Sequence, residues 1–195
     1  MLERCGAKVT EIRRLSGDSP WGGLEGFDGI VLPGGESTTM GRLLVEEGLL
    51  EPLRACGRAG MPVYGSCAGL ILLCREVEGP DGELLDQPRL NLLDARVRRN
   101  AFGRQSDSFE TRLDVKGVAC NVEAVFIRAP VIVSCGSCVE VLCRVEGPLG
   151  PSPVAVRQHH ILATSFHPEL TSDGRFHESF LRLCLAWRAA GGLFS

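Results

Sequence analysis

Hydrophobic positions in the first half of the chain indicate strands that alternate with helices. Two short apolar segments, residues 28–35 and 61–65, each precede a stretch in which apolar residues recur at helical spacing. The first helical stretch, residues 37–60, is broken at Gly48, and the second covers residues 68–77. This alternation predicts parallel β-α units, with helices covering both faces of the sheet.

Beyond residue 95 the pattern changes to short β-rich segments with few helical signals. Residues 78–90 are interpreted as a polar loop, and residues 174–190 as an amphipathic C-terminal helix. The apolar side of that helix is expected to carry Phe176, Phe180, Leu181, Cys184 and Trp187. We therefore predict one α/β domain over residues 1–195, with a mostly parallel central sheet and a late antiparallel β patch.

Composition and charge exclude several classes of protein. A chain of 195 residues that is 44% hydrophobic can bury one good core. Its net charge is −3 and its basic residues are scattered, which argues against a nucleic-acid or membrane surface. The sequence shows neither an apolar run of about 20 residues nor the apolar centre of a signal peptide. We expect a soluble, cytoplasmic protein.

Nine cysteines are spread along the chain without the spacing of a secreted disulfide framework. Cys74 and Cys184 lie inside apolar helical patterns, where a reduced thiol packs as a small hydrophobe. Cys135 and Cys138 form a C-x-x-C pair, and Cys143 is near, but a zinc site needs a further ligand at a suitable spacing. Thiols on or between strands are the simpler interpretation of this cluster.

Cys67 stands at a cramped turn, in the sequence GSCAG between a short apolar strand and an apolar helix. Such a turn strains its central residue and pushes the side chain outward, and small neighbours let the backbone pass. The start of the following helix favours a thiolate, and its N–H groups can stabilise an oxyanion. The pattern predicts that Cys67 is a nucleophile.

A cysteine nucleophile requires a histidine as proton acceptor and a third group that orients it. His167 follows an apolar strand and precedes Pro168, which favours an extended backbone. Glu169, two residues on, would then share a face with His167 and orient its ring; a strand-capping histidine beside a solvated glutamate is the alternative. His159 and His160 are expected to point to opposite faces of one strand, so they cannot both face a site. His177 is expected at the surface of the C-terminal helix. We assign no role to any of the three.

Residues 32–42, LPGGESTTMGR, form a third element that points to ligand binding. Gly34 and Gly35 follow an apolar strand and allow close backbone approach to a ligand. Ser37 or Thr38 is expected to cap the following helix. The stretch lacks the G-K-[ST] of a phosphate-binding loop, so a carboxamide or oxyanion site is favoured.

Taken together, these elements resemble the class I, triad-type glutamine amidotransferases. Four stretches, PGGESTTM, RRNAFGRQSDSFE, VFIRAP and SFHPELTSDGRFHESFL, resemble more narrowly the glutaminase subunit family of pyridoxal 5′-phosphate synthase. The resemblance implies a flavodoxin-like, three-layer fold and hydrolysis of L-glutamine through a γ-glutamyl thioester. It also implies delivery of ammonia to a (β/α)8-barrel synthase subunit in a large hetero-oligomer for vitamin B6 synthesis, without a metal or cofactor in this chain.

Matching the motifs position by position assigns roles that the resemblance implies. Cys67 is the nucleophile, His167 the general acid and base, and Glu169 its orienting group; Gly35 and Ala68 supply N–H groups to the oxyanion. The residues that would hold glutamine are Gly35, Glu36, Ser37, Arg99, Ile127 and Arg128. Guanidinium groups suit the substrate α-carboxylate, although surface ion pairs would explain both arginines equally well.

Family members open with an apolar strand and a Gln-Gly turn, so we expect this domain to be N-terminally short. That expectation leaves a docking or regulatory subunit without glutamine turnover as an alternative function. Another triad cysteine hydrolase, such as a peptidase or a different amidotransferase subunit, is a further alternative. RRNAFGRQSDSFE argues against it, because generic triad chemistry has no evident use for that stretch.

Overall fold

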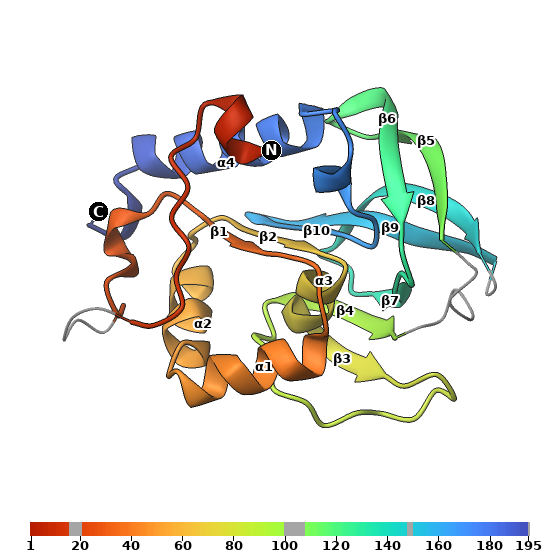
Figure 1. The fold of residues 1–195 in the computed structure, drawn as a ribbon, viewed down its shortest axis with the longest axis horizontal. Coiled ribbons are helices and arrows are strands. Elements are labelled where there is room, and N and C mark those ends of the chain that lie inside the picture. Colours follow the sequence, from red (N-terminus) through yellow and green to blue (C-terminus); the bar gives the residue numbers. More distant parts are fainter. Residues whose placement is uncertain (16–20, 100–107, 148–149, 195) are drawn as a thin grey trace.

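The computed structural model describes residues 1–15, 21–99, 108–147 and 150–194, and arranges them in three layers (Figure 1). The middle layer is a five-stranded sheet of order β1-β2-β10-β9-β8. Its strands are β1 (Ile30–Leu32), β2 (Val63–Ser66), β10 (Ile161–Thr164), β9 (Gly150–Gln158) and β8 (Glu140–Gly147). β1, β2 and β10 are parallel, and β9 and β8 extend the sheet antiparallel. The predicted flavodoxin-like α/β class, with its late antiparallel patch, is confirmed.

Helices cover both faces of this sheet, as the β-α alternation predicts. α1 (Ser37–Glu46), α2 (Leu50–Arg58) and α3 (Ala68–Leu73) lie on one face, and α4 (Arg175–Ala189) lies on the other (Figure 1). Short 3-10 turns complete the set: η1 (Leu2–Cys5), η2 (Leu24–Gly26), η3 (Pro168–Leu170) and η4 (Gly192–Phe194). Among the described residues, none of the helices has the length and apolar character needed to cross a bilayer.

Two smaller sheets flank the central one. β3 (Cys74–Glu78) pairs parallel with β4 (Leu93–Arg98), which pairs antiparallel with β7 (Val131–Cys135). β5 (Phe109–Val115) and β6 (Ala119–Phe126) form an antiparallel ribbon. All of these strands except β3 come from the region where β-rich segments were expected.

The helix expected over residues 68–77 is shorter than predicted. α3 ends at Leu73, and Cys74 has an extended backbone that starts β3. Pairing of β3 with β4 overrides the weak local helical preference of these residues. The prediction that Cys74 lies within a helix is therefore wrong, although its side chain is fully buried as expected.

The loop over residues 78–90 is not simply solvated. Gln87 is 6% exposed and Leu90 is fully buried, and the Leu90 N–H donates to the carbonyl of Leu72 at 2.7 Å.

His159 and His160 also differ from expectation, since they form the turn between β9 and β10 instead of continuing a strand. His159 has a φ of 53°, and Nε2 of His160 hydrogen-bonds to a backbone carbonyl of α2.

Glu36 caps α1, which was expected to be capped by Ser37 or Thr38. Its carboxylate accepts hydrogen bonds from the N–H of Thr38 at 3.1 Å and of Thr39 at 2.7 Å. The side chain reaches these donors because Glu36 has an extended backbone immediately before the helix. Two otherwise unpaired N–H groups of the first turn are thereby satisfied.

Two apolar clusters pack against opposite faces of the central sheet. Val63 and Ile161 belong to the cluster under α1, α2 and α3, whereas Tyr64 and Leu162 belong to the cluster under α4 and the β5–β6 ribbon. This division follows from the strand repeat, in which neighbouring side chains point to opposite faces. Both faces of β2 and β10 are thus buried, as is typical of interior parallel strands.

α3 packs unusually close to β1. A Cβ placed on Gly69 would lie 2.0 Å from the carbonyl oxygen of Leu32, which is a backbone atom that cannot rotate away. The absence of a side chain at Gly69 therefore allows the helix after Cys67 to lie directly against the strand before the Gly34 turn.

Gly69→Ala is expected to destabilise the fold by about 1–3 kcal/mol, because α3 or β1 must shift to admit the methyl group. Gly26→Ala is the matched control, since a Cβ there meets nothing within 4 Å, and its effect should stay within about 0.5 kcal/mol. Urea unfolding measures both. A Gly69→Ala protein as stable as its control would contradict the close packing.

Candidate active site

Cys67 occupies the predicted strained turn between β2 and α3. Its backbone has φ 49° and ψ −101°, a conformation that residues with a side chain rarely adopt. Its N–H donates to the carbonyl of Thr164 at 2.8 Å, which ties the turn to the end of β10. Cys67 is buried, with 8% of the residue exposed.

His167 and Glu169 follow β10, beside the Cys67 turn. Nδ1 of His167 lies 2.8 Å from Oε1 of Glu169, so the predicted pairing of base and orienting carboxylate is present. The local geometry differs from the expected extended chain, because Glu169 lies in η3 and the 3-10 turn brings its carboxylate back to the ring. The N–H of His167 donates to the carbonyl of Val125 at 2.8 Å, which joins the site to β6.

The three side chains are electrostatically coupled. Hydrogen bonds to the Cys67 sulfur and to the Glu169 carboxylate raise the pKa of His167 to about 9 against the opposing effect of burial. Burial disfavours ionised Glu169, but the hydrogen bond with His167, a backbone hydrogen bond and the charges of His167 and His177 together outweigh that cost, and the pKa of Glu169 is lowered. A histidine held between a sulfur and a carboxylate is the arrangement in which the histidine serves as the base for a cysteine nucleophile.

The turn after β1 lies against the histidine. A Cβ on Gly34 would lie 2.3 Å from Cε1 of His167, so the backbone of the predicted ligand-binding turn is in close contact with the ring. Gly35 lies two residues before the first residue of α1, and Ala68 follows Cys67 as the first residue of α3. The two residues expected to donate N–H groups to an oxyanion thus stand just before α1 and at the start of α3.

Polar residues to which no role was assigned from the sequence form hydrogen bonds next to the triad. Oγ of Ser66 donates to Oε1 of Glu169 at 3.4 Å. Thr164 donates its hydroxyl proton to the carbonyl of Phe166, so the buried Tyr64 hydroxyl must donate to Oγ1 of Thr164, 3.0 Å away. Ser66 was noted only as a small neighbour of Cys67, and no local sequence signal marks its contact with a residue 103 positions away.

Three of the predicted glutamine-binding residues meet at the start of α1. Nη2 of Arg99 lies 2.7 Å from Oε1 of Glu36, and Ser37 is 2% exposed beside them. Burial raises the pKa of Glu36, but hydrogen bonds from Thr39 outweigh this, with help from Thr38 and Arg99, and lower the pKa to about 2. The ion pair that was the alternative to glutamine binding for Arg99 is therefore present, and its partner Glu36 is itself a predicted glutamine-binding residue.

Ile127 and Arg128 follow the end of β6. The hydrogen bond between Val125 and His167 brings this end of β6 to the triad. Ile127 is 38% exposed, and Arg128 has a positive φ of 45°, so the chain turns sharply there. The RRNAFGRQSDSFE stretch lies largely over residues 100–107, which are outside the described residues.

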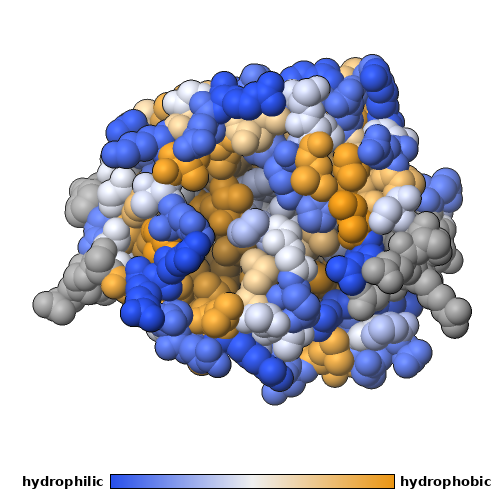
Figure 2. Space-filling view, in the orientation of Figure 1, coloured by the Kyte–Doolittle hydropathy of each residue, from blue (hydrophilic) through white to orange (hydrophobic). Residues whose placement is uncertain are grey.

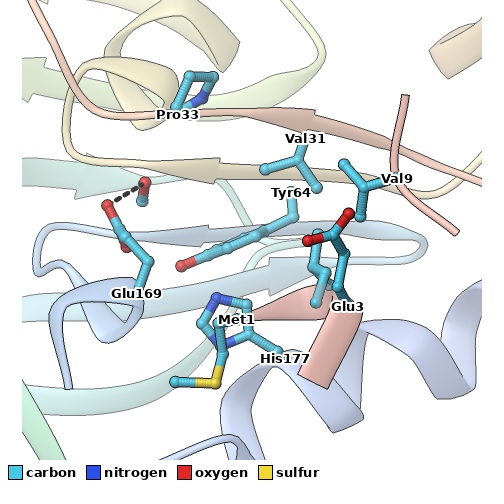
Figure 3. Close-up of a pocket in the computed structure, with 10 residues that line it drawn as sticks. Met1, Glu3, Val9, Val31, Pro33, Tyr64, Glu169 and His177 are labelled. Carbon is cyan, nitrogen blue, oxygen red and sulfur yellow. Dashed lines mark hydrogen bonds between the residues drawn. The ribbon is translucent and has the colours of Figure 1, made fainter. Parts of the chain in front are cut away.

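A cavity of about 260 Å³ lies beside the triad, between η1, β1, β2 and α4. In Figure 3, Glu169 lies at one end of this cavity, with Tyr64 and His177 along it and Val9 at the other end. Figure 2 shows apolar side chains gathered around the hollow beside the N-terminal segment. Oε2 of Glu169 is buried there without a hydrogen-bond partner among the described residues.

His177 lines the same cavity and is 4% exposed, so the prediction that it lies at the surface is wrong. It lies on the inner side of α4, where its ring contacts the Tyr64 ring edge-on, with 6.2 Å between the two ring centres. Burial lowers the pKa of His177, which therefore carries less charge at neutral pH.

Within the part of the chain that the structure describes, all nine cysteines are free thiols, and no group of three or more potential ligands gathers as a metal site does. Cys135 lies on β7, Cys143 on β8, and Cys138 is exposed between them. This arrangement matches thiols on or between strands.

A strained cysteine beside a histidine and a glutamate, at the carboxyl ends of parallel strands, is the arrangement expected of a triad-type cysteine amidotransferase. The chain matches the model of the SNO glutamine amidotransferase family over residues 1–186. It belongs to that family, and the resemblance inferred from its motifs is confirmed.

Proteins named pyridoxal 5′-phosphate synthase subunit PdxT are similar to nearly the whole chain. The one from Frankia alni is 57% identical over 181 residues, which cover 92% of this chain and 84% of the relative. The one from Geobacillus sp. (strain WCH70) is 47% identical over 182 residues, covering 93% and 87%. A solved structure of a glutamine amidotransferase shares 45% identity at a TM-score of 0.81, covering 94% of this chain and 89% of that one.

The raised pKa of His167 makes stability depend on pH. Native His167 keeps a proton that the unfolded chain releases between about pH 6.5 and 9, so this stabilisation is complete below the window and is lost as pH rises through it. Between about pH 6 and pH 9.5 the wild type should lose about 1–3 kcal/mol more unfolding free energy than His167→Gln. Urea unfolding at both pH values measures this, and equal losses would refute the coupling.

Proposed function

We propose that this chain hydrolyses L-glutamine to L-glutamate and ammonia, and that the ammonia is used for pyridoxal 5′-phosphate synthesis. The observation that carries the proposal is the Cys67–His167–Glu169 triad, with Cys67 in a strained turn and His167 hydrogen-bonded to both partners. Membership of a glutamine amidotransferase family supports the reaction class. The names of the relatives support the use of the ammonia.

The first half of the reaction forms a thioester. The Cys67 thiolate attacks the side-chain carboxamide carbon of glutamine, and the resulting oxyanion accepts hydrogen bonds from the N–H groups of Gly35 and Ala68. Imidazolium His167 then donates its proton to the departing nitrogen, and ammonia leaves as the C–N bond breaks. A γ-glutamyl thioester on Cys67 and a neutral His167 remain.

The second half reverses the proton movement. Neutral His167 takes a proton from a water molecule that attacks the thioester carbon, and the Cys67 thiolate leaves as glutamate forms. Glu169 keeps the imidazole ring oriented through Nδ1 in both halves. No metal or cofactor enters either step as we propose it.

The substrate is held at its amino-acid end. Backbone and side-chain groups of Gly35, Glu36 and Ser37 line the start of α1, and Glu36 is suited to the α-ammonium group by its low pKa. Arg99 and Arg128 are suited to the α-carboxylate, and Ile127 to the aliphatic part of glutamine.

A synthase subunit is the partner in this proposal, because the relatives are named as subunits of a synthase. We propose a (β/α)8-barrel chain that accepts the ammonia, within a large hetero-oligomer. The free thiols of this chain fit a reducing compartment, so we place the complex in the cytoplasm.

A docking or regulatory subunit of the same complex, without turnover, is the second candidate. The cavity beside Glu169 favours it, because a buried carboxylate oxygen without a partner leaves the orienting group less firmly held. The two candidates share a partner and differ in catalysis.

Cys67→Ala should abolish glutamate release, leaving at most about one part in 10³ of the wild-type rate. The measurement is glutamate formation from glutamine with and without the synthase subunit, together with binding of each variant to that subunit. Wild-type activity that the variant lacks, with equal binding, supports the enzyme. A wild type that binds the synthase but releases no glutamate supports the docking subunit.

A further inference from the structure

Gln87 is a buried polar residue for which the reaction described above has no role. It comes from the loop between β3 and β4, and only 6% of it is exposed. Its side-chain oxygen lies 3.0 Å from Nη1 of Arg99 and 3.4 Å from the hydroxyl of Thr38, and its nitrogen lies 3.4 Å from the hydroxyl of Ser37. The amide therefore joins Arg99 to the start of α1.

Chemistry fixes the orientation of this amide. Arginine has only donors, so the atom of Gln87 that faces Arg99 must be the oxygen, and the nitrogen must face Ser37. Burial of an amide costs free energy unless the amide is hydrogen-bonded. Two of the three contacts of Gln87 are with residues of the glutamine site proposed above, Arg99 and Ser37, and the third is with the neighbouring Thr38.

The loop and the helix do not need Gln87 in order to fold. The N–H groups of Leu90 and Leu92 donate to the carbonyls of Leu72 and Leu73, which anchors the loop to α3. Glu36 alone caps the first turn of α1. The contacts of the Gln87 side chain are thus additional to the ones that hold the backbone.

The guanidinium of Arg99 makes its hydrogen bonds through Nη1 and Nη2. Both Nη1 protons are directed at Thr38 and Gln87, and one Nη2 proton is directed at Glu36. The Nε–H and the other Nη2–H have no partner among the described residues. In an arginine side chain the Nε–H and one Nη2–H lie on the same edge of the planar group and form a fork that binds a carboxylate through both oxygens.

We infer that Gln87 is a positioning residue of the glutamine site, which holds Arg99 so that its Nε–Nη2 edge receives the substrate α-carboxylate. The inference rests on the proposed glutaminase function. Gln87 touches neither the thiol nor the scissile carboxamide, so its loss should weaken substrate binding more than it slows the chemical steps.

The test compares Gln87→Leu, Gln87→Glu and Gln158→Leu in the complex with the synthase subunit. Gln87→Glu keeps the acceptor oxygens that face Arg99. Gln158 is the matched control, because it is also a glutamine whose side-chain oxygen accepts a hydrogen bond, from the N–H of Asp94. It lies level with the amino end of β2, whereas Cys67 follows the carboxyl end of that strand. We expect Gln87→Leu to raise KM about 10- to 100-fold and to lower kcat less than about 3-fold. Gln87→Glu should recover most of the loss, and Gln158→Leu should match the wild type.

Labelling of Cys67 separates binding from thiol reactivity. A diazoketone analogue of glutamine requires the amino-acid site, whereas iodoacetamide reports only the thiolate, and peptide mass spectrometry resolves Cys67 from the exposed Cys120 and Cys138. Gln87→Leu should slow diazoketone labelling by the same factor as kcat/KM and leave iodoacetamide labelling unchanged.

Equal slowing of both reagents, or an unchanged KM, would overturn the positioning role. If Gln87→Leu fails to fold, Gln87→Asn provides the same comparison, because its shorter side chain cannot span Ser37 and Arg99. A wild-type protein that the diazoketone does not label would instead refute the glutaminase proposal itself.

Discussion

The parallel pairing of β2 with both β1 and β10 is the constraint on which the site depends. Parallel strands end at the same edge of a sheet, so the turns that follow β1, β2 and β10 meet there. Those turns carry Gly34, Cys67 and His167, which come from three distant parts of the sequence. Close packing of Gly34 on the His167 ring and of Gly69 on β1 then sets the spacing between them.

The sequence was sufficient for the parts of the structure that local patterns encode. The strand–turn–helix around Cys67 could be predicted because small residues must surround a strained turn. The pairing of His167 with Glu169 could be predicted because only Pro168 separates them, although a 3-10 turn and not an extended chain brings them together. The end of α3 could not, because Cys74 leaves the helix in order to pair with β4, a contact made by residues about twenty positions later.

Long-range contacts explain the other differences. His177 was expected at the surface because it stands next to Glu178 on the C-terminal helix, but α4 turns that residue toward Tyr64. Gln87 lies in a stretch of polar character, and only the folded chain shows that Arg99 and Ser37 surround it. Residues of this kind act through partners far away in sequence, so no local pattern marks them.

The separation of the triad along the chain also bears on the order of folding. Tyr64 and Thr164, which join β2 to β10 behind the site, are 100 positions apart. Contacts over such distances form slowly, because a long loop must close before they are made. During synthesis the strand that precedes Cys67 is complete long before β10 leaves the ribosome. The thiol therefore emerges without its base, and the nascent chain becomes reactive only when its last strand joins the sheet.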